Sequence, residues 1–379
     1  MGKENPLRLL IVTEDLRVGG AEVVAADLAG VLTEQSWQVF IAPIRDGGSM
    51  REAFKCVAEE VFPPLARRHV DVLAPWRIAR LILRHRIDCV VVLDPLRNGL
   101  FYAAVGSLLS GRKVLRLCWC HSWPGGQAGN FAASLRAYYR LGLLDAVVCI
   151  GPSQRRCLRE HGLPWRALPL VPNGLDFHRL LGPATDLVFP PGRKVVLQVA
   201  NVMPDKDFDT LLAAMQILAQ QRRDFHLVLA GRGTDSPAMR QAVADRGLTP
   251  FVTLGGHRND VAGLLAASDV FVLSSRSETF PLAPLEAMAA GVPVVASDLP
   301  AFDDLFTAGR EGLKVPPGDA KALAQALALL IEDGELSQEL AAAGARRAEA
   351  FSASTMAGRF CRLVAALQRS RHHVTNSNA

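Results

Sequence analysis

The sequence predicts an α/β protein of two domains, each a parallel sheet covered by helices on both faces, with a cleft between the two. Three observations lead to this fold class. Short, nearly continuous runs of Val, Ile, Leu and Ala alternate with segments of helical period, which is typical of parallel strands buried on both faces. The chain has 379 residues, a length that suits two domains of roughly 100–200 residues each. The alternation breaks clearly once, near the middle.

The expected elements follow in chain order. Strands are predicted over residues 7–13, 39–44, 89–93, 114–118, 146–150 and 168–171 in the first half, and over 195–200, 226–230, 251–254, 270–273 and 292–296 in the second. Helices lie between them; residues 208–219 and 320–331 carry apolar side chains at helical spacing along one face. Strands that alternate with helices imply parallel sheets with right-handed crossovers.

The break in the pattern sets the expected domain boundaries. Residues 181–193 contain three prolines and two glycines without a clean period, which favours a linker. We therefore expect an N-terminal domain over 1–180, a linker over 181–193 and a C-terminal domain over 194–370. The polar residues 371–379 are predicted to form a disordered tail.

The charge is uneven along the chain. Residues 1–180 hold 23 Lys and Arg against 16 Asp and Glu, whereas the remainder holds 19 against 21. A basic first half favours an anionic partner. Nucleic acid is disfavoured because no recognition motif is present and only 6% of residues are aromatic. An anionic membrane surface is the better candidate: Arg77, Arg80 and Arg84 would lie along one stripe of a helix over 76–86. A solvated face of a core-packed helix remains the alternative.

The expected compartment is the cytoplasm, with peripheral contact on the inner face of the cell membrane as a further expectation. No apolar run approaches the roughly 18 residues that a membrane helix needs, and the apolar run near the start is too short for a secretory signal. Seven cysteines form a sparse, odd-numbered set, as expected in a reducing environment.

Two carboxylates eight residues apart carry the strongest chemical signal. Glu278 follows a predicted strand, and Glu286 lies one turn into the next predicted helix. The start of that helix offers free backbone N–H groups and the positive end of the helix dipole, which attract anions. Phosphates on the helix start and sugar hydroxyls on the two acids would satisfy both features. A capped surface helix with two solvated acids is the alternative.

This E-x7-E segment, with Phe280-Pro281-Leu282 inside it, resembles family 4 of the retaining glycosyltransferases, which have the GT-B fold of two Rossmann-like domains. Further motifs stand in the matching order: Gly19-Gly20-Ala21-Glu22, the V-P-N-G-x-D segment 171–176, the loop 199–206 and the A-G-x-G turn 230–233. The resemblance covers nearly the whole chain. It implies a transferase that moves a sugar from a nucleoside-diphosphate donor of the UDP or GDP type.

The resemblance also implies roles for residues of the second domain. Glu286 would bind the ribose hydroxyls, and Glu278 would bind the donor sugar near its reacting carbon. Backbone N–H groups of Phe280 and Leu282, on either side of Pro281, would hold the diphosphate. Lys206 would neutralise the charge on the departing diphosphate, which is the principal catalytic need.

Two positions depart from the family pattern. Asn201 stands where the family usually has an Arg; Arg232 or Arg258 could supply that cation, and Asn201 can still donate a hydrogen bond. Thr279 replaces a common glycine and would tighten the sugar pocket. Arg258 also falls on the loop that passes the nucleotide base in relatives.

In the first domain, Gly19 and Gly20 would allow close backbone approach to phosphate or sugar. His121 matches a strand-end His that faces the donor sugar in relatives, and a structural role is its alternative.

Neither a metal nor a bound cofactor is expected. Asp205, Asp207 and Asp209 have a D-x-D spacing, but they lie at a predicted helix start and are expected to act as caps. The predicted function is a retaining glycosyltransferase that acts on a glycan, glycolipid or small-molecule acceptor in surface polysaccharide or glycoconjugate synthesis. Two alternatives remain open: a catalytically silent sugar-nucleotide-binding protein, suggested by Asn201, and a sugar-nucleotide epimerase.

Overall fold

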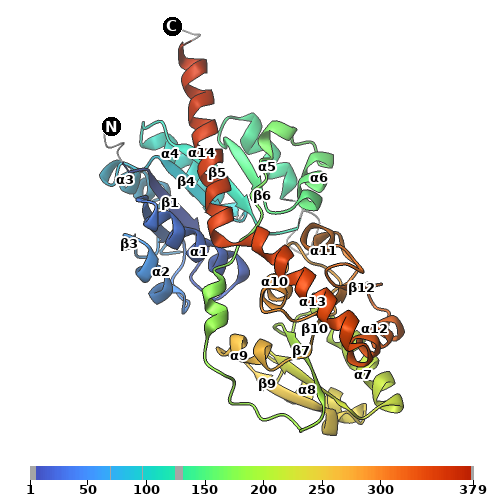
Figure 1. The fold of residues 1–379 in the computed structure, drawn as a ribbon. Helices are drawn as coiled ribbons and strands as arrows, with labels where there is room; N and C mark the ends of the chain where they lie inside the picture. Colours follow the sequence, from blue (N-terminus) through green and yellow to red (C-terminus); the bar gives the residue numbers. More distant parts are fainter. Residues whose placement is uncertain (1–5, 69, 96, 124–130, 377–379) are drawn as a thin grey trace. The chain divides into compact units, whose positions relative to one another are not determined.

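The structure is a computed structural model that describes residues 6–68, 70–95, 97–123 and 131–376, apart from the side chains of Arg97 and residues 372–376. It divides into two compact units (Figure 1). The first unit comprises Met1–Leu175 and Phe351–Ala379, and the second comprises Asp176–Ala350.

The first unit contains a six-stranded sheet whose pairings are all parallel, in the order β3-β2-β1-β4-β5-β6. Its strands are β1 (Arg8–Thr13), β2 (Gln38–Pro43), β3 (Glu60–Val61), β4 (Cys89–Leu93), β5 (Leu115–Cys120) and β6 (Ala146–Cys149). The strand order reverses direction between β1 and β4. In open sheets of this kind, ligands bind at the carboxyl ends of the strands beside that switch point.

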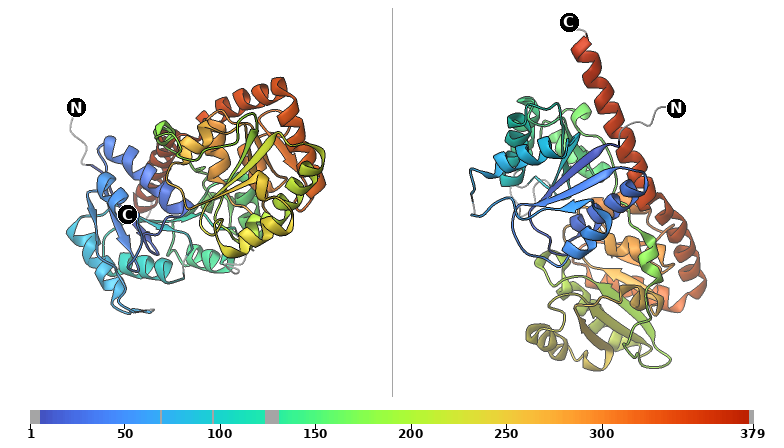
Figure 2. Two further views of the ribbon diagram at one scale, coloured as in Figure 1. Left: turned by 90° about the horizontal axis from the view of Figure 1, so that it is seen from below. Right: turned by 90° about the vertical axis from the view of Figure 1, so that its left-hand side faces the viewer.

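Helices cover both faces of this sheet. They are α1 (Gly20–Glu34), α2 (Arg51–Val57), α3 (Ala74–Arg84), α4 (Arg97–Leu109), α5 (Ala132–Arg140), α6 (Pro152–Glu160), the 3-10 turn η1 (Trp165–Ala167) and α14 (Ala353–Asn376). The right-hand view of Figure 2 shows α14 (red) beside α1 (dark blue) on one side of the strands. Helices α3 and α4 pack together on the other side.

The second unit repeats the arrangement, in the order β12-β11-β10-β7-β8-β9. Its strands are β7 (Lys194–Val199), β8 (Phe225–Ala230), β9 (Val252–Gly256), β10 (Val270–Leu273), β11 (Val294–Ser297) and β12 (Leu313–Val315). Its α-helices are α7 (Phe208–Gln221), α8 (Pro237–Asp245), α9 (Val261–Ala266), α10 (Leu282–Ala289), α11 (Pro300–Leu305), α12 (Ala320–Glu332) and α13 (Gly334–Ala348). The 3-10 turns are η2 (Phe177–Leu181), η3 (Pro204–Lys206), η4 (Thr249–Phe251) and η5 (Glu349–Phe351). The switch point lies between β7 and β10.

The predicted fold class, two Rossmann-like α/β domains, is confirmed, because both sheets are parallel and helices flank them. One predicted strand is wrong. Residues 168–171 make only an isolated bridge, from Leu170 to Cys149. Pro169 and Pro172 lack the N–H groups that a regular ladder needs. The short strands β3 and β12 were not predicted, because two or three residues show no periodicity.

The units do not divide at the predicted linker 181–193. This segment lies in the second unit, where it packs tightly against α9. A Cβ atom added to Gly263 of α9 would lie 2.3 Å from the Thr185 nitrogen. The irregular composition of residues 181–193 therefore indicates a segment without helix or strand that packs within one unit, and not a linker between two units.

The C-terminal boundary also differs from the prediction of a domain over 194–370. Helix α14 belongs to the first unit, because its apolar face is buried there. The Phe360 ring lies 6.1 Å from the Trp37 ring and 6.0 Å from the Trp119 ring, and Met356 and Val364 are buried as well. The predicted disordered tail 371–379 is helical as far as Asn376, and residues 377–379 lie outside the described part.

The predicted arginine stripe on α3 is incomplete. Arg80 and Arg84 are exposed, but the Arg77 guanidinium contacts the Asp71 carboxylate at 2.8 Å. The backbone N–H of Arg67 and the Arg77 guanidinium hold the pKa of Asp71 well below its usual range. Arg77 therefore anchors the loop before α3. As for spanning segments, no helix in the described ranges is both long and apolar enough to cross a membrane.

Candidate functional site

The carboxyl ends of β7 and β10 bring two predicted site residues together. Lys206 lies on η3, after β7, and Glu278 lies in the loop after β10. Their side chains form an ion pair, with Lys206 Nζ 2.5 Å from Glu278 Oε1. The Lys206 side chain is 21% exposed and that of Glu278 is 7% exposed. The pair thus places one cation and one anion at the switch point where this fold binds ligands.

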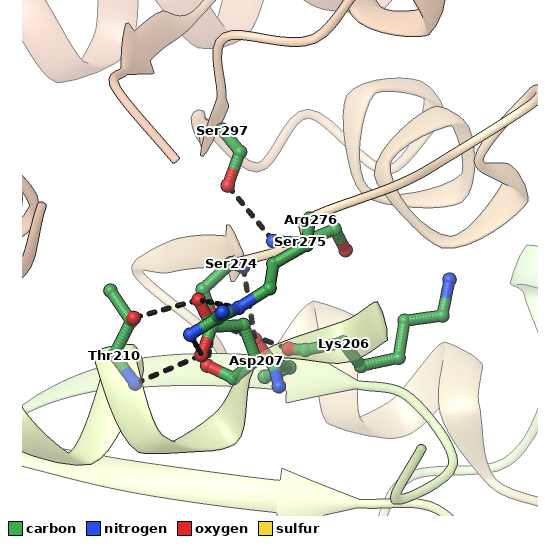
Figure 3. A network of polar contacts seen from close by, with 8 residues as sticks. Lys206, Asp207, Thr210, Ser274, Ser275, Arg276 and Ser297 are labelled. Carbon is green, nitrogen blue, oxygen red and sulfur yellow. Dashed lines mark hydrogen bonds and ion pairs between the residues drawn. The ribbon is translucent and has the colours of Figure 1, made fainter. Parts of the chain in front are cut away.

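Serine side chains hold the loop after β10 in place. The Ser275 hydroxyl donates to Glu278 Oε1 at 2.8 Å, and the Ser275 N–H donates to the Ser297 hydroxyl at 2.8 Å. The Ser274 hydroxyl donates to the Asp207 carbonyl oxygen at 3.2 Å. In Figure 3 a dashed line joins Ser275 to Ser297, and Ser274 lies beside Asp207. The Glu278 carboxylate is therefore fixed by a hydroxyl as well as by Lys206.

Asp207 stabilises the loop that carries Lys206. Its φ of 42° lies in the left-handed region, which Asp tolerates better than most residues. Its carboxylate caps α7, accepting the Thr210 hydroxyl at 2.7 Å, and pairs with Arg276 Nε at 3.0 Å. Burial would raise the pKa of Asp207, but hydrogen bonds from Arg276 and Thr210 outweigh it and the pKa is lowered. In Figure 3 the Lys206 side chain extends away from this cap.

The start of α10 offers an anion site. Pro281 is the N-cap residue, and no side chain within the described ranges caps this helix. The backbone N–H groups of Leu282 and Ala283 begin the helix at its positive end. Glu286 lies one turn further along and is half-buried. The predicted residues 279–282 and 286 therefore share one short loop-and-helix segment after β10.

The loop after β7 is joined to the loop after β8 through Asn201. Its side-chain Oδ1 accepts the Arg232 backbone N–H at 3.0 Å. Gly231, with a φ of 140°, allows this contact, because a Cβ atom there would lie 2.0 Å from the Ala200 carbonyl oxygen. Asn201 thus has a structural contact as well as its predicted donor-binding role.

Arg258 is engaged by carboxylates of its own unit. Its Nε donates to Asp260 at 2.7 Å, and its guanidinium also pairs with Asp186. The hydrogen bonds that Arg258 donates to Asp260 and Asp186 hold the pKa of Arg258 above its usual range. The positive charge of Arg258 is therefore already compensated, which makes it a weak candidate for the missing cation.

In the first unit, Gly19 makes room for a carboxylate. Gly19 caps α1, which begins at Gly20, and a Cβ atom on Gly19 would lie 2.5 Å from Glu22 Oε2. The Glu22 carboxylate accepts the Thr13 hydroxyl at the end of β1, at 3.1 Å. Burial, reinforced by the charge of Asp94, raises the pKa of Glu22. Half-buried acids at this edge suit hydroxyl groups better than phosphate.

His121 follows β5 directly, and its backbone N–H donates to Asp94 Oδ1 at 2.7 Å. Its Nδ1 lies 3.2 Å from the Trp119 carbonyl oxygen, its buried Nε2 has no hydrogen bond of standard geometry in the described structure, and the Asn173 side chain interacts with the ring. Burial lowers the pKa of His121 against the charge of Asp94 and the Asn173 side chain, which both act to raise it. A neutral ring that donates from Nδ1 would leave Nε2 as an acceptor for a hydroxyl group.

In the described part of the chain, no group of three or more His, Cys, Asp or Glu side chains could hold a metal ion. Asp207 caps α7, as predicted, and Asp209 pairs with Arg246 at 3.1 Å. The D-x-D residues thus serve local contacts in this unit.

Arg276 and the neighbouring residues Ser274 and Ser275 were not predicted as site residues from the sequence. Arg276 is the arginine that the structure joins to the Lys206 loop, through Asp207 and through its N–H, which donates to the Asp205 carbonyl oxygen at 2.8 Å. Its position directly after a buried strand at the switch point was a usable signal. The contact with Asp207 was not predictable, since 69 residues separate the two.

Comparison with known families adds to this geometry. Residues 18–179 match the model "Glycosyltransferase Family 4", and residues 185–347 match the model "Glycosyl transferases group 1". The chain belongs to the family 4, group 1 glycosyltransferases. Each of the two family models matches most of one unit of this chain.

The names of individual relatives assign them to the synthesis of bacterial glycans or glycolipids. The chain is 36% identical over 150 residues to the lipopolysaccharide core biosynthesis mannosyltransferase LpsB of Rhizobium meliloti, covering 38% of this chain and 43% of LpsB. It is 32% identical over 197 residues to the phosphatidyl-myo-inositol mannosyltransferase of Mycobacterium leprae, covering 51% and 52% of the two chains. The match thus spans about half the length of these relatives.

Solved structures agree with the fold. A glycosyltransferase from Rickettsia africae is similar with a TM-score of 0.81 at 15% identity, covering 96% of this chain and 99% of that one. Anabaena HepE, solved in complex with UDP-glucose, is similar with a TM-score of 0.79 at 19% identity, covering 95% and 100%. At these identities, the likeness concerns the fold.

Proposed function

We propose that this protein is a retaining glycosyltransferase whose second unit binds a nucleoside-diphosphate sugar and whose first unit binds the acceptor. The observation that carries the proposal is the Lys206–Glu278 pair beside the start of α10. A cation, a carboxylate and a helix N-terminus together match the diphosphate and the hydroxyls of such a donor. Glu286, one turn into α10, is suited to the ribose hydroxyls.

The proposed reaction breaks the bond between the anomeric carbon and a diphosphate oxygen. A new bond forms between that carbon and the acceptor oxygen, on the same face of the sugar. The acceptor proton leaves with the nucleoside diphosphate, which takes the bonding electrons. Lys206 exchanges Glu278 for the diphosphate and stabilises its growing charge, and the freed Glu278 carboxylate accepts hydroxyls of the sugar. No step in this scheme requires a metal ion.

The printed names of the relatives support the acceptor class. LpsB acts in lipopolysaccharide core biosynthesis, and the Mycobacterium leprae relative mannosylates phosphatidyl-myo-inositol. We propose a glycan or glycolipid acceptor in surface polysaccharide or glycoconjugate synthesis. The UDP-glucose complex of HepE supports a nucleotide sugar as donor.

The test is incubation with radiolabelled UDP- and GDP-sugars and a lipid or glycan extract as acceptor. We expect transfer of label, and NMR of the product should show the anomeric configuration of the donor. Inverted configuration would contradict the retaining mechanism. Donor binding without transfer or hydrolysis would favour the silent sugar-nucleotide-binding protein, and a changed sugar still attached to the nucleotide would favour an epimerase.

We also propose that α3 of the first unit contacts anionic membrane. Arg80 and Arg84 are exposed, and so are the apolar side chains of Trp76 and Leu83. Exposed apolar and basic residues on one helix suit a headgroup layer. Each such cation contributes about 1 kcal/mol near a charged surface, and salt screens it.

Co-sedimentation with vesicles tests this contact. We expect salt-sensitive binding to phosphatidylglycerol vesicles but not to phosphatidylcholine vesicles, reduced in Arg80→Gln/Arg84→Gln. Arg77→Gln is not suitable here, because Arg77 holds the Asp71 loop. Equal recovery of wild type and the double variant would remove α3 from the contact.

A further inference from the structure

We propose that a pocket at the amino edge of the first sheet binds an anionic lipid, with its chain in the pocket and its charged head at the rim. The pocket has a volume of about 770 Å³, within the roughly 300–1,000 Å³ typical of small-molecule sites. It lies beside the residues that precede β4, β5 and β6 and beside the end of α14. The candidate site described above uses the opposite, carboxyl ends of strands, so this pocket is separate from it.

The pocket has an excess of positive charge. Arg112, Lys113, Arg116 and Arg371 line it, against Asp88 and Asp145. Both acids are already engaged: Asp145 pairs with Arg371 at 2.5 Å, and Asp88 accepts the Arg8 backbone N–H at 3.0 Å and pairs with Arg112 at 3.7 Å.

Two donors of the pocket remain available to an anion. Lys113 is exposed and has no ion-pair partner among the described residues. The Arg116 Nε is buried without a hydrogen bond in the described structure, 3.5 Å from Asp145 Oδ2. A carboxylate or phosphate head would satisfy both.

The remaining lining is mostly apolar, with the polar residues Ser107, Gln368 and Ser370 among it. Val114 and Leu115 are buried at the start of β5, Leu367 approaches from α14, and the Leu108 side chain, 57% exposed, lies at the end of α4. Figure 1 shows α14 running alongside β5, which explains how segments far apart in sequence share these walls. Apolar walls beneath cationic groups match a molecule with one hydrocarbon chain and one acidic head.

Helix dipoles alone do not account for these cations. Lys and Arg in the last turn of a helix stabilise its negative end. Arg84 in α3 and Arg140 in α5 have that position. Arg112 and Lys113 instead lie beyond α4, which ends at Leu109, in the connection to β5.

Isothermal titration of the full chain with dodecyl phosphate, below its micelle concentration and without nucleotide, tests the proposal. We expect saturable binding to dodecyl phosphate, and none to inorganic phosphate or to the uncharged dodecyl maltoside. Arg112→Gln/Lys113→Gln should weaken binding at least tenfold, and Leu108→Ala should weaken it several-fold. The matched controls are Arg140→Gln/Arg159→Gln, exposed arginines outside the pocket, and Leu109→Ala, the exposed neighbour of Leu108.

Each contrary outcome has a definite meaning. Equal binding of inorganic phosphate would reduce the pocket to an anion site, and equal binding of dodecyl maltoside would show nonspecific detergent uptake. Either result overturns the proposal, as does wild-type affinity in the pocket variants or no binding at all. Since no donor is present, failure here leaves the proposed transferase activity untouched. Likewise, Lys206→Ala should bind dodecyl phosphate like wild type.

Discussion

Replacing Glu278 with Gln should tighten the binding of a free nucleoside diphosphate while lowering sugar transfer. In the structure, the Lys206 ammonium is occupied by the Glu278 carboxylate at 2.5 Å. A diphosphate must displace that carboxylate to reach Lys206. The Gln side chain is close in size but uncharged, so the competition weakens. The same change removes the charged acceptor that we assign to the donor sugar, so transfer suffers.

The magnitude follows from the strength of the displaced contact. A hydrogen bond to a charged group contributes about 1.5–3 kcal/mol, and one between neutral groups about 0.5–1.5 kcal/mol. Exchanging Glu for Gln therefore lowers the cost of displacement by about 1–1.5 kcal/mol. That difference corresponds to roughly tenfold tighter binding.

Isothermal titration with UDP and GDP measures the effect. Ser275→Ala is the matched control, because it removes the 2.8 Å hydroxyl contact to Glu278 without a change of charge. It should leave the dissociation constants within about twofold of wild type. If Glu278→Gln binds both nucleotides no more tightly than wild type, Glu278 does not compete for Lys206 and the reasoning fails.

Three further outcomes are expected. Glu286→Ala should weaken nucleotide binding, since two ribose hydroxyls would each lose a contact of about 1.5–3 kcal/mol; an unchanged dissociation constant would refute the ribose assignment. Asp207→Ala should lower the unfolding free energy by about 0.5–2 kcal/mol at pH 7 through loss of the cap. Because the folded pKa of Asp207 is lowered, its stabilisation exists above the unfolded pKa of about 3.9 and disappears as the pH falls through the folded value. Urea unfolding at neutral and acid pH should therefore show the gap between variant and wild type closing in acid; a constant gap would point to another cause. Transfer should persist in excess EDTA, because Lys206 and the start of α10 handle the diphosphate charge; loss of activity restored by manganese would revive Asp205 and Asp207 as ligands.

The strands at the site were predictable because they are buried on both faces. The predicted strand 270–273 matches β10 residue for residue, since its four apolar residues leave no ambiguity of period. Segment 168–171 is also rich in apolar residues, yet Pro169 within it and Pro172 directly after it limit its pairing to one isolated bridge. Likewise, α14 shows helical period whichever unit it packs against. Its place in the first unit depends on the fit of Phe360 between Trp37 and Trp119, which is a tertiary contact.

The site residues were predictable one by one, but their contacts were not. Family motifs pointed to Lys206 and Glu278 separately, and the two are 72 positions apart in the sequence. Only the adjacency of β7 and β10 makes them an ion pair. The same adjacency brings Arg276, which no motif indicated, into contact with Asp207. Arg258 shows the reverse case: its motif suggested a nucleotide contact, whereas the structure engages it with Asp186 and Asp260.

The turnover number of Lys206→Ala tests the central claim most directly. If Lys206 stabilises the charge that grows on the departing diphosphate, the variant should lose turnover by on the order of 10²-fold or more, with a smaller loss of donor affinity. Transfer and hydrolysis of a radiolabelled donor, with the donor dissociation constant measured in parallel, give both numbers. Unchanged turnover would contradict the account, and a collapse in Arg232→Ala instead would assign the charge to Arg232.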